Sequence, residues 1–529
     1  MNNIIKKSYT YLKKYKYKLL LYYLLTLTMS TISVIYPQII GKFTDILIEK
    51  NIQGLYKYIL FFISFNLINL LFTYISGKLY IYIQAQSAYK FNKEVNTHVW
   101  NIPILKSAKY DSAYLADRIN TDTNSIIIFS INAVQTGLST IISVGISSAF
   151  MIRVDKSIFL IALLASILYC SIYILLRDKI YKVNRLLMDS KSQFASGIFD
   201  QLSNIRSLKI HGFYDRNLGR LDESFSDLLS NTLSTYNLNY VYSFFDDFIS
   251  HLSSIIFFIY GGISVIKGQI TIGQYISLNS YLMVLMSSSA TIFSLAKETK
   301  LAKVAFDRVD ELSKIDLETN SKIRMNDIDE ILINFTFAYP DHQKNFQYNY
   351  KLDKGKIYKL VGDNGAGKTT LIDNIIGLYI DTYEGDILYN GIDIRNIDMK
   401  YMRKYKISYV DQKLDLGSLD KIDRTDEKEL YKIILENDQE DLVDISDREI
   451  FYEKSFDKMS GGQMRKVQIY NEVFKDSSLM ILDEPANYLD KKSIGNLRKL
   501  LLKISRKQIT IIVDHDNKFD DIVDEIIYV

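Results

Sequence analysis

Hydrophobic residues are distributed unevenly along the 529-residue chain. The N-terminal part alternates long runs of Leu, Ile, Phe and Tyr with Lys-rich stretches, whereas the C-terminal part mixes short apolar runs with polar residues. Each long run is close to the ~20 residues that a helix needs to cross a bilayer. These runs are 19–40, 58–80, 131–152, 157–176, 244–266 and 275–295. The pattern predicts a six-helix membrane domain over residues 1–314 and an α/β domain over residues 315–529.

The first apolar run follows six lysines, as the core of a secretory signal would. The run from Leu19 to Ile40 is longer than the ~7–15 residues of such a core, and no small-residue cleavage site closes it. We therefore expect it to remain as a membrane span.

The connections between the spans predict their orientation. Short connections follow the first, third and fifth spans, whereas long polar segments, 81–130 and 177–243, follow the second and fourth. Lys and Arg favour the cytoplasmic side of a membrane. Because both long segments and the N-terminus are rich in these bases, we expect both termini and both long segments, as helical extensions, on the cytoplasmic side.

Charge and cysteine content exclude several classes of protein. The net charge of +3 is small for this length, which argues against a nucleic-acid partner. Cys170 is the single cysteine, so an intramolecular disulfide and a multi-cysteine metal site are both excluded. We expect Cys170 to serve helix packing.

A phosphate-binding loop is the clearest chemical motif. In "GKIYKLVGDNGAGKTTLIDNIIGLY" an apolar strand runs into a Gly-rich loop and then a helix. The glycines let N–H groups converge on phosphate oxygens at the helix N-terminus, Lys368 reaches the outer phosphates, and the Thr369 hydroxyl can ligate Mg²⁺. An ordinary Gly-rich turn would not require this strand, loop and helix in order. The predicted nucleotide-binding residues here are Gly362, Asn364, Gly365, Ala366, Gly367, Lys368, Thr369 and Thr370.

A second motif supplies carboxylates. In "SLMILDEPANYLD" four apolar residues predict a buried strand that delivers Asp483 and Glu484 to its C-terminal end, beside the phosphate loop of a parallel sheet. We expect Asp483 to hold Mg²⁺ and Glu484 to polarise the attacking water. The motif alone would also fit a turn after a strand, but its combination with Lys368 favours catalysis.

At "MSGGQMRKVQI" the chain resembles the ATP-binding cassette (ABC) family. Its signature motif is similar to Ser460, Gly461, Gly462 and Gln463. Four further residues match the family's pattern in order along about 200 residues: Tyr339 resembles the adenine-stacking aromatic, Gln412 the Q-loop glutamine, Asp490 the D-loop aspartate and His515 the switch histidine. The resemblance implies that these residues bind and hydrolyse ATP, with Gln412 also a Mg²⁺ ligand.

The membrane half is similar to the exporter-type (type I) transmembrane domain of the same family. The segments 114–122 and 205–216 resemble its two cytoplasmic coupling regions, and 261–282 resembles the turn between its last two spans. Solvated helices without a coupling role would also fit the two cytoplasmic segments, but their agreement with the expected topology favours coupling.

The resemblance implies a half-transporter that acts as a dimer. Each ATP would lie between the phosphate loop of one copy and the Ser460–Gly462 motif of the other, and closure would move the spans through the cytoplasmic loops. A homodimer is favoured, but intact motifs also fit one partner of an asymmetric pair, so a heterodimer stays open.

Three features depart from the family pattern. The D-loop carries Ala486, Asn487 and Tyr488. An acid-rich segment that contains "FYEKSFDK" separates Gln412 from Ser460. The sequence stops at Val529 without the C-terminal helices of many relatives. No peptidase-like domain precedes the first span in this sequence, so processing of a cargo is not expected.

Within the apolar fifth span lie Asp246, Asp247 and His251. Asp247 is about 20 residues before Lys267, or about 30 Å along a helix, which is the thickness of the hydrocarbon layer. Three interpretations stay open: acids at the inner interface, acids facing a cavity for cationic cargo, or a proton-linked pair of Asp247 and His251 at i, i+4. We expect the three residues to line the inner mouth.

The predicted function is ATP-driven efflux of a peptide or amphipathic small molecule. The expected cofactors are ATP and Mg²⁺. The expected partners are the lipid bilayer and a second half-transporter. We expect a bacterial plasma membrane. The alternatives are an exporter-shaped importer of a metal chelate and an ATP-gated regulatory subunit that moves no cargo. The apolar spans exclude a soluble cassette protein of translation.

Overall fold

The computed structural model describes residues 2–110, 115–116, 118–339, 345–380, 382–412, 459–473, 475 and 477–529. Residues 413–458, which make up nearly all of the acid-rich segment, lie outside these residues, as do Tyr114 and Asp117 of the predicted coupling segment. The chain forms two compact units. The first comprises Met1–Val99 and Asp111–Lys314, and the second comprises Trp100–Tyr110 and Ile315–Val529.

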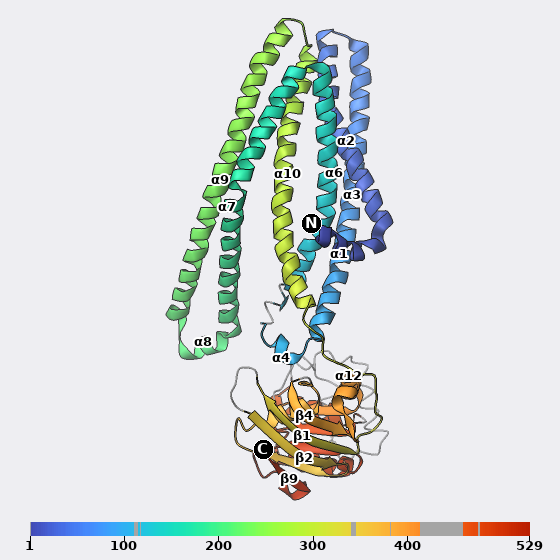
Figure 1. Cartoon of the computed structure of the whole chain (residues 1–529), viewed down its shortest axis with the longest axis vertical. Helices are drawn as coiled ribbons and strands as arrows, with labels where there is room; N and C mark the ends of the chain where they lie inside the picture. Colours follow the sequence, from blue (N-terminus) through green and yellow to red (C-terminus); the bar gives the residue numbers. More distant parts are fainter. Residues whose placement is uncertain are drawn as a thin grey trace. The chain divides into compact units, whose positions relative to one another are not determined.

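Six long helices form the first unit, as the hydrophobic pattern predicts (Figure 1). Each is long and apolar enough to cross a membrane. They are α2 (Lys16–Ile48), α3 (Ile52–Trp100, whose last residue belongs to the second unit), α6 (Thr123–Val154), α7 (Lys156–Ser203), α9 (Tyr214–Ile266) and α10 (Ile272–Ser313). Because α7 has 48 residues and α9 has 53, both extend well beyond the ~20 residues that a bilayer requires. The polar segments that separate the predicted spans are therefore mostly continuations of the same helices.

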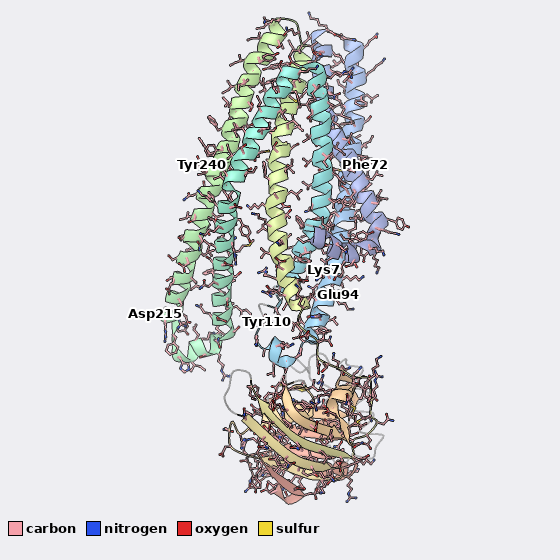
Figure 2. The ribbon with its side chains drawn as sticks, viewed as in Figure 1. Lys7, Phe72, Glu94, Tyr110, Asp215 and Tyr240 are labelled. Carbon is pink, nitrogen blue, oxygen red and sulfur yellow. The ribbon has the colours of Figure 1, made fainter. Side chains whose placement is uncertain are left out.

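Helices α7 and α9 pack along each other as a long hairpin (Figure 1). The short helix α8 (Ile205–His211) joins them, and Gly212 ends it in the left-handed conformation, with φ 65°. A side chain with a Cβ would disfavour that backbone conformation. Asp215, in the first turn of α9, lies at this end of the hairpin (Figure 2).

The N-terminal helix α1 (Asn2–Leu12) packs on the bundle. The Tyr11 hydroxyl donates to Glu94 of α3 at 2.9 Å, and the buried Ser130 hydroxyl of α6 donates to Ser8 at 2.8 Å. Figure 2 shows Lys7 and Glu94 in this region, where Lys7 also lies 3.7 Å from Asp310 of α10. Polar contacts thus tie α1 to three helices of the first unit.

Helices α2 and α10 approach very closely where α2 ends and α10 begins. A Cβ on Gly273 would lie 2.1 Å from the Gly41 carbonyl oxygen. Beside this contact, Asp45 accepts hydrogen bonds from the Thr271 hydroxyl and the Gly273 N–H, both at 2.8 Å. The carboxylate therefore satisfies the Gly273 N–H, one of the main-chain donors left free at the start of α10. Its negative charge is also stabilised by the positive end of the helix dipole.

The second unit contains two sheets. The parallel sheet has the order β6-β7-β8-β3-β9, with β3 (Ile357–Val361), β6 (Ile407–Val410), β7 (Leu479–Asp483), β8 (Ile509–Val513) and β9 (Glu525–Tyr528). The antiparallel sheet has the order β2-β1-β4-β5, with β1 (Glu330–Ala338), β2 (Asn345–Asp353), β4 (Tyr383–Tyr389) and β5 (Ile392–Asp393). This agrees with the predicted α/β domain.

Continuous apolar runs explain the parallel sheet. Strands β7 and β8 are buried at every position, as strands covered on both faces must be. One face packs against the antiparallel sheet and α11 (Lys368–Ile375), and the other packs against α16 (Gly461–Val473) and α17 (Lys491–Ile504). The helix α12 (Met399–Tyr405) precedes β6.

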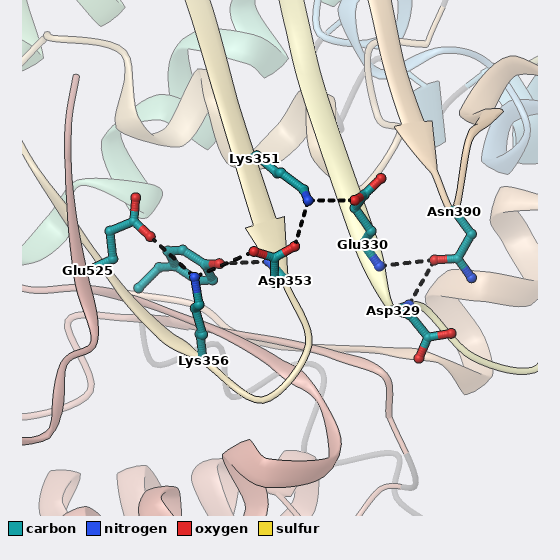
Figure 3. Close-up of polar contacts among 8 residues, drawn as sticks. Asp329, Glu330, Lys351, Asp353, Lys356, Asn390 and Glu525 are labelled. Carbon is teal, nitrogen blue, oxygen red and sulfur yellow. Dashed lines mark hydrogen bonds and ion pairs between the residues drawn. The ribbon is translucent and has the colours of Figure 1, made fainter.

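Polar contacts join the edges of the two sheets (Figure 3). Lys351 of β2 lies 2.8 Å from Glu330 of β1 and 3.2 Å from Asp353, and Lys356 lies 3.4 Å from Asp353 and 3.8 Å from Glu525 of β9. The Asn390 side-chain oxygen accepts N–H bonds from Asp329 and Glu330. The lysine contacts hold the turn between β2 and β3, where the chain passes from one sheet to the other, and the Asn390 contacts hold the start of β1.

The connection between α3 and α6 is divided between the units. Its short helix α4 (Ile104–Ser107) belongs to the second unit, where Leu105 packs on the core and Lys106 lies 3.1 Å from Asp316. Residues 118–122 of the predicted coupling segment instead lead into α6, and Asp122 pairs with Arg308 of α10. The part of this connection that packs with the second unit therefore precedes the predicted segment.

Candidate functional site

The Gly-rich loop connects β3 to α11 at the carboxyl edge of the parallel sheet. Gly365 and Gly367 have φ values of 80° and 111°, which disfavour other residues. A Cβ on Gly367 would also lie 2.4 Å from the Tyr348 hydroxyl and 2.5 Å from the Phe346 ring. The loop conformation thus depends on glycine for both backbone freedom and space.

The side chains that follow the loop have different surroundings. Lys368 Nζ donates to the carbonyls of Gly362 at 2.6 Å and Asp363 at 3.2 Å, which holds the ammonium across the loop. Thr369 is exposed, whereas Thr370 is buried and its hydroxyl lies 3.0 Å from the Tyr339 hydroxyl. Of the two predicted threonines, Thr369 is the one whose side chain is accessible to a bound cation.

Tyr339 lies beside this loop at the end of β1. Its ring packs edge-on against Phe337, with centroids 4.9 Å apart, and against Phe346 at 6.4 Å. Its hydroxyl contact to Thr370 fixes the ring next to the first turn of α11. The predicted adenine-stacking residue is therefore half-buried in an aromatic cluster beside the phosphate loop.

Four predicted residues meet at the carboxyl ends of neighbouring strands. Gln412 follows β6, Asp483 ends β7 with Glu484 after it, and His515 follows β8, which adjoins β3 and the phosphate loop. Glu484 Oε1 lies 3.7 Å from His515 Nε2, and the Glu484 N–H donates to the Val513 carbonyl at 2.8 Å. Glu484 has a φ of 47°, a strained value for a residue with a side chain, as is common at functional sites.

The electrostatics at these strand ends favour a bound cation. Burial raises the pKa of the Asp483 carboxyl to about 6, and the nearby acids Glu484 and Asp411 act in the same direction. The hydroxyl of Thr369, the amide oxygen of Gln412 and the carboxylate of Asp483 are hard oxygen donors of the kind that Mg²⁺ prefers. Among the described residues no three His, Cys, Asp or Glu side chains form a metal-binding group. Phosphate oxygens and water would therefore have to complete a Mg²⁺ shell here.

The Ser460–Gln463 motif begins α16. The Ser460 N–H donates to the Gln463 side-chain oxygen at 3.0 Å, and the Gln463 N–H donates to Ser460 Oγ at 3.4 Å, which forms a capping box. A Cβ on Gly462 would lie 2.6 Å from the Tyr488 carbonyl oxygen. The helix start therefore packs closely on the D-loop, where Tyr488 has a φ of 66°.

Asp490 caps the next helix. Its Oδ1 accepts the Ser493 N–H at 2.7 Å at the start of α17, and this hydrogen bond holds the pKa of the Asp490 carboxyl below its usual range. The D-loop aspartate thus has a structural role within this chain.

Sequence reasoning did not identify Arg465 of α16. This arginine is fully buried, and its guanidinium donates to the carbonyls of Asp411, Asp483 and Glu484 and to the Gln468 side chain. It therefore joins the end of β6, the end of β7 and the residue that follows β7. Arg465 is followed in the sequence by the apolar residues Val467 and Ile469, which are also buried. This apolar context is the signal that could have indicated a buried arginine.

The three residues predicted to line the inner mouth do not lie together. Asp246 of α9 is half-buried and lines a cavity of about 250 Å³ in the first unit. Asp247 and His251 are exposed and are not among the residues that line it. Within the described part of the chain, no hydrogen bond or ion pair joins Asp247 to His251. The structure therefore separates Asp246 from the other two.

Comparison with known proteins gives matches to both parts of the chain. A model of the ABC transporter transmembrane region matches residues 19–289, and an ABC transporter model matches residues 346–487. The transmembrane match alone covers just over half of the chain, and the second match contains the phosphate loop and Glu484.

Several bacterial transport proteins are similar to this chain. The transport/processing ATP-binding protein ComA of Streptococcus pneumoniae is 25% identical over 430 residues, which cover 76% of this chain and 58% of that protein. The lactococcin-G-processing and transport ATP-binding protein LagD of Lactococcus lactis is 25% identical over 477 residues, with 85% and 66% covered. The subtilin transport ATP-binding protein SpaT of Bacillus subtilis is 23% identical over 474 residues, with 82% and 74% covered. The chain thus spans less than two thirds of the length of the first two relatives.

These matches agree with the membrane helices and with the phosphate loop at the edge of the parallel sheet. The chain is a membrane protein that carries a transmembrane region and an ATP-binding domain in one polypeptide. It belongs to the ABC transporter family.

Proposed function

We propose that this protein hydrolyses ATP to export a peptide or an amphipathic small molecule across a bacterial plasma membrane, as one half of a dimeric transporter. The observation that supports this most directly is the set of Lys368, Gln412, Asp483, Glu484 and His515 at the carboxyl edge of one sheet, in a chain that also carries six apolar helices.

The proposed hydrolysis assigns a role to each group. Loop N–H groups and Lys368 bind the phosphates of ATP, and Tyr339 contacts the base. Glu484 accepts a proton from the water whose oxygen attacks the γ-phosphorus, the bond to the β-phosphate oxygen breaks, and ADP leaves. His515, 3.7 Å from Glu484, contacts the γ-phosphate. Held by oxygens of Thr369, Gln412 and Asp483, Mg²⁺ would withdraw charge from the phosphate oxygens.

The Ser460–Gln463 motif supports the proposed dimer. The capping box orders the start of α16, so the N–H groups of Gly461 and Gly462 remain at its positive end. We propose that they bind the γ-phosphate of an ATP held by the other copy. A homodimer is favoured because the chain carries every one of these motifs.

Coupling to the spans would use the cytoplasmic loops. None of the residues of α8 is buried, and Ile205 and Ile210 are exposed at its surface. In an aqueous compartment an exposed apolar pair of this kind favours a contact with another surface. We propose that 205–216 couples to an ATP-binding domain and that both termini lie in the cytoplasm.

The names of the relatives favour a peptide cargo. LagD and SpaT are named for the transport of lactococcin-G and subtilin, and we propose a peptide cargo for this chain by analogy with them. Asp246 in the fifth span is the proposed contact for a positive group on such a cargo.

Transport into inverted vesicles tests the direction and the cargo class. The protein in inside-out vesicles is expected to accumulate a labelled amphipathic peptide in an ATP-dependent manner, and the Glu484→Gln variant is expected to accumulate none above background. ATP-dependent uptake in right-side-out vesicles alone would instead show import. Nucleotide-dependent binding of a protein partner without any peptide transport would favour a regulatory subunit.

A further inference from the structure

A cavity of about 250 Å³ lies between three helices of the first unit, α7, α9 and α10. Its wall combines aromatic rings with charged groups of both signs. The residues on which the inference depends are Tyr169, Tyr242, Asp246, Phe293, Lys297 and Lys300.

In the proposed topology the turn between α9 and α10 lies at the outer membrane edge, which places the cavity where a bilayer changes from hydrocarbon to head groups. Asp246 is about 20 residues, or about 30 Å, from the end of α9 at Ile266, and Lys297 is about 25 residues, or about 37 Å, from the start of α10 at Ile272. The hydrocarbon layer is about 30 Å thick. Amphipathic molecules in the inner leaflet concentrate at this level.

Two opposite charges line this cavity. Asp246 and Lys297 are both half-buried, and within the described part of the chain neither forms an ion pair or a side-chain hydrogen bond. Lys300, by contrast, lies 3.5 Å from Asp178 and 4.9 Å from the centre of the Tyr181 ring. Because charges at membrane depth are costly unless compensated, Asp246 and Lys297 favour a ligand that brings charge of both signs.

Aromatic rings lie beside these two charges, since Tyr242 is one helical turn from Asp246 and Phe293 is one turn from Lys297. The Tyr169 ring lies 5.2 Å from the Phe293 ring and 6.0 Å from the Tyr242 ring, and the two tyrosine hydroxyls are hydrogen-bonded to each other. Such a wall suits an aromatic or aliphatic side chain. The volume is below the ~300–1,000 Å³ of pockets that hold a whole drug-sized ligand, so the cavity fits one or two side chains of a larger molecule.

We propose that this cavity binds a zwitterionic segment of a peptide cargo, with a basic side chain at Asp246, an acidic side chain at Lys297 and an apolar side chain against Tyr169 and Phe293. This inference rests on the proposed function of peptide export. A peptide is favoured over a lipid head group because the aromatic wall lies beside the two charges, where a head group offers no apolar side chain.

The neighbouring residue Asp247 provides a matched control, because it is exposed and does not line the cavity. The probes are four short amphipathic peptides around one tyrosine: one with Lys and Glu, one with Lys only, one with Glu only and one with neither. For each, the concentration that gives half-maximal stimulation of ATP hydrolysis and the uptake into inverted vesicles are measured with the full chain in lipid.

Asp246→Asn is expected to raise the half-maximal concentration about tenfold for the two peptides that contain Lys and to leave the other two unchanged. Lys297→Gln is expected to do the same for the two peptides that contain Glu. Asp247→Asn should match the unchanged protein, and Asp246→Glu should restore most of the response. Equal basal hydrolysis in all variants shows that they are folded.

One result would overturn this inference and leave the proposed export in place. In that result the unchanged protein transports the peptides, and Asp246→Asn and Asp247→Asn respond equally to every peptide. Stimulation that follows the content of phosphatidylethanolamine in the lipid rather than the peptide would also overturn it, in favour of a head-group site. If the unchanged protein neither responds to nor transports any of the four peptides, the proposed peptide export fails together with this inference.

Discussion

Arg465 Nη2 donates a hydrogen bond of 2.6 Å to the main-chain carbonyl of Asp483. The same guanidinium also binds the carbonyls of Glu484 and Asp411, so one buried side chain holds the main chain at the two predicted site carboxylates and at the end of β6. Arg465 does not extend into the site itself, and its expected role is to position Glu484 and Asp483.

Replacement of Arg465 tests this role. Arg465→Met removes the donor of three carbonyls, and the buried one, that of Asp483, costs about 1–3 kcal/mol when it is left unsatisfied. We expect kcat for ATP hydrolysis to fall at least about tenfold while the KM for ATP changes little, because the phosphate loop is untouched. Arg465→Lys should recover part of kcat. The exposed Lys499→Met is the control, and equal falls in kcat and in ATP affinity would instead indicate a general loss of structure.

The two threonines after the phosphate loop should differ in effect. Thr369 is exposed at the start of α11, whereas Thr370 is buried against the Tyr339 hydroxyl. Thr369→Val is therefore expected to lower Mg²⁺-dependent hydrolysis at least about a hundredfold, and Thr370→Val to lower mainly the Tm. Titration of Mg²⁺ against hydrolysis measures the first effect. A larger loss of hydrolysis in Thr370→Val would reverse the assignment of the two hydroxyls.

Asp373 of α11 predicts a pH dependence of stability. Burial raises the pKa of its carboxyl from 3.8 to about 6, although the Tyr379 hydroxyl donates to it. Between about pH 4 and pH 6 the folded state therefore holds a proton that the unfolded state releases, so this group lowers stability as pH rises through that range. Asp373→Asn should remove that loss.

The measurement is the apparent Tm of the full chain in lipid discs. We expect the Tm of Asp373→Asn, relative to the unchanged protein, to rise from pH 4 to pH 6 and then stay constant. Glu384→Gln, at an exposed position, should show no such trend. A difference that is the same at every pH would show that Asp373 is not the responsible group.

The contact between Gly41 and Gly273 predicts a sharp steric effect. Gly273→Ala would place a methyl group 2.1 Å from a main-chain oxygen, so α2 and α10 must separate and the two hydrogen bonds of Asp45 must lengthen. Overpacking of this kind costs about 1–3 kcal/mol. We expect a lower apparent Tm for Gly273→Ala and little change for Gly262→Ala, where no atom lies within 4 Å of the added Cβ.

The sequence predicts the fold and the phosphate loop because their determinants are local. Long apolar runs define the six spans, and the strand before Gly362 and the helix after Lys368 identify the loop without any tertiary contact. The placement of Asp483 and Glu484 near that loop follows from the rule that parallel strands end at one edge.

Other features depend on contacts between distant residues. Arg465 acts on carbonyls 54 and 18 positions away, and its apolar sequence neighbours indicate its burial but not these partners. Asp246 and Asp247 are adjacent, but they point to different sides of α9, and only the packing of α7 and α10 shows that Asp246 lines a cavity. The packing of α4 with the second unit likewise depends on contacts with Asp316 and the core rather than on its own sequence.

The central claim is that two copies of this chain form complete ATP-hydrolysing sites. The most direct measurement is Mg-ATP hydrolysis by the purified chain alone in lipid discs, beside Glu484→Gln, with ATP binding measured for both. We predict that the unchanged chain hydrolyses ATP and that Glu484→Gln binds ATP but hydrolyses it at least about a hundredfold more slowly. ATP binding without hydrolysis by the folded, unchanged chain would contradict the claim, and so would hydrolysis that Glu484→Gln leaves unaffected.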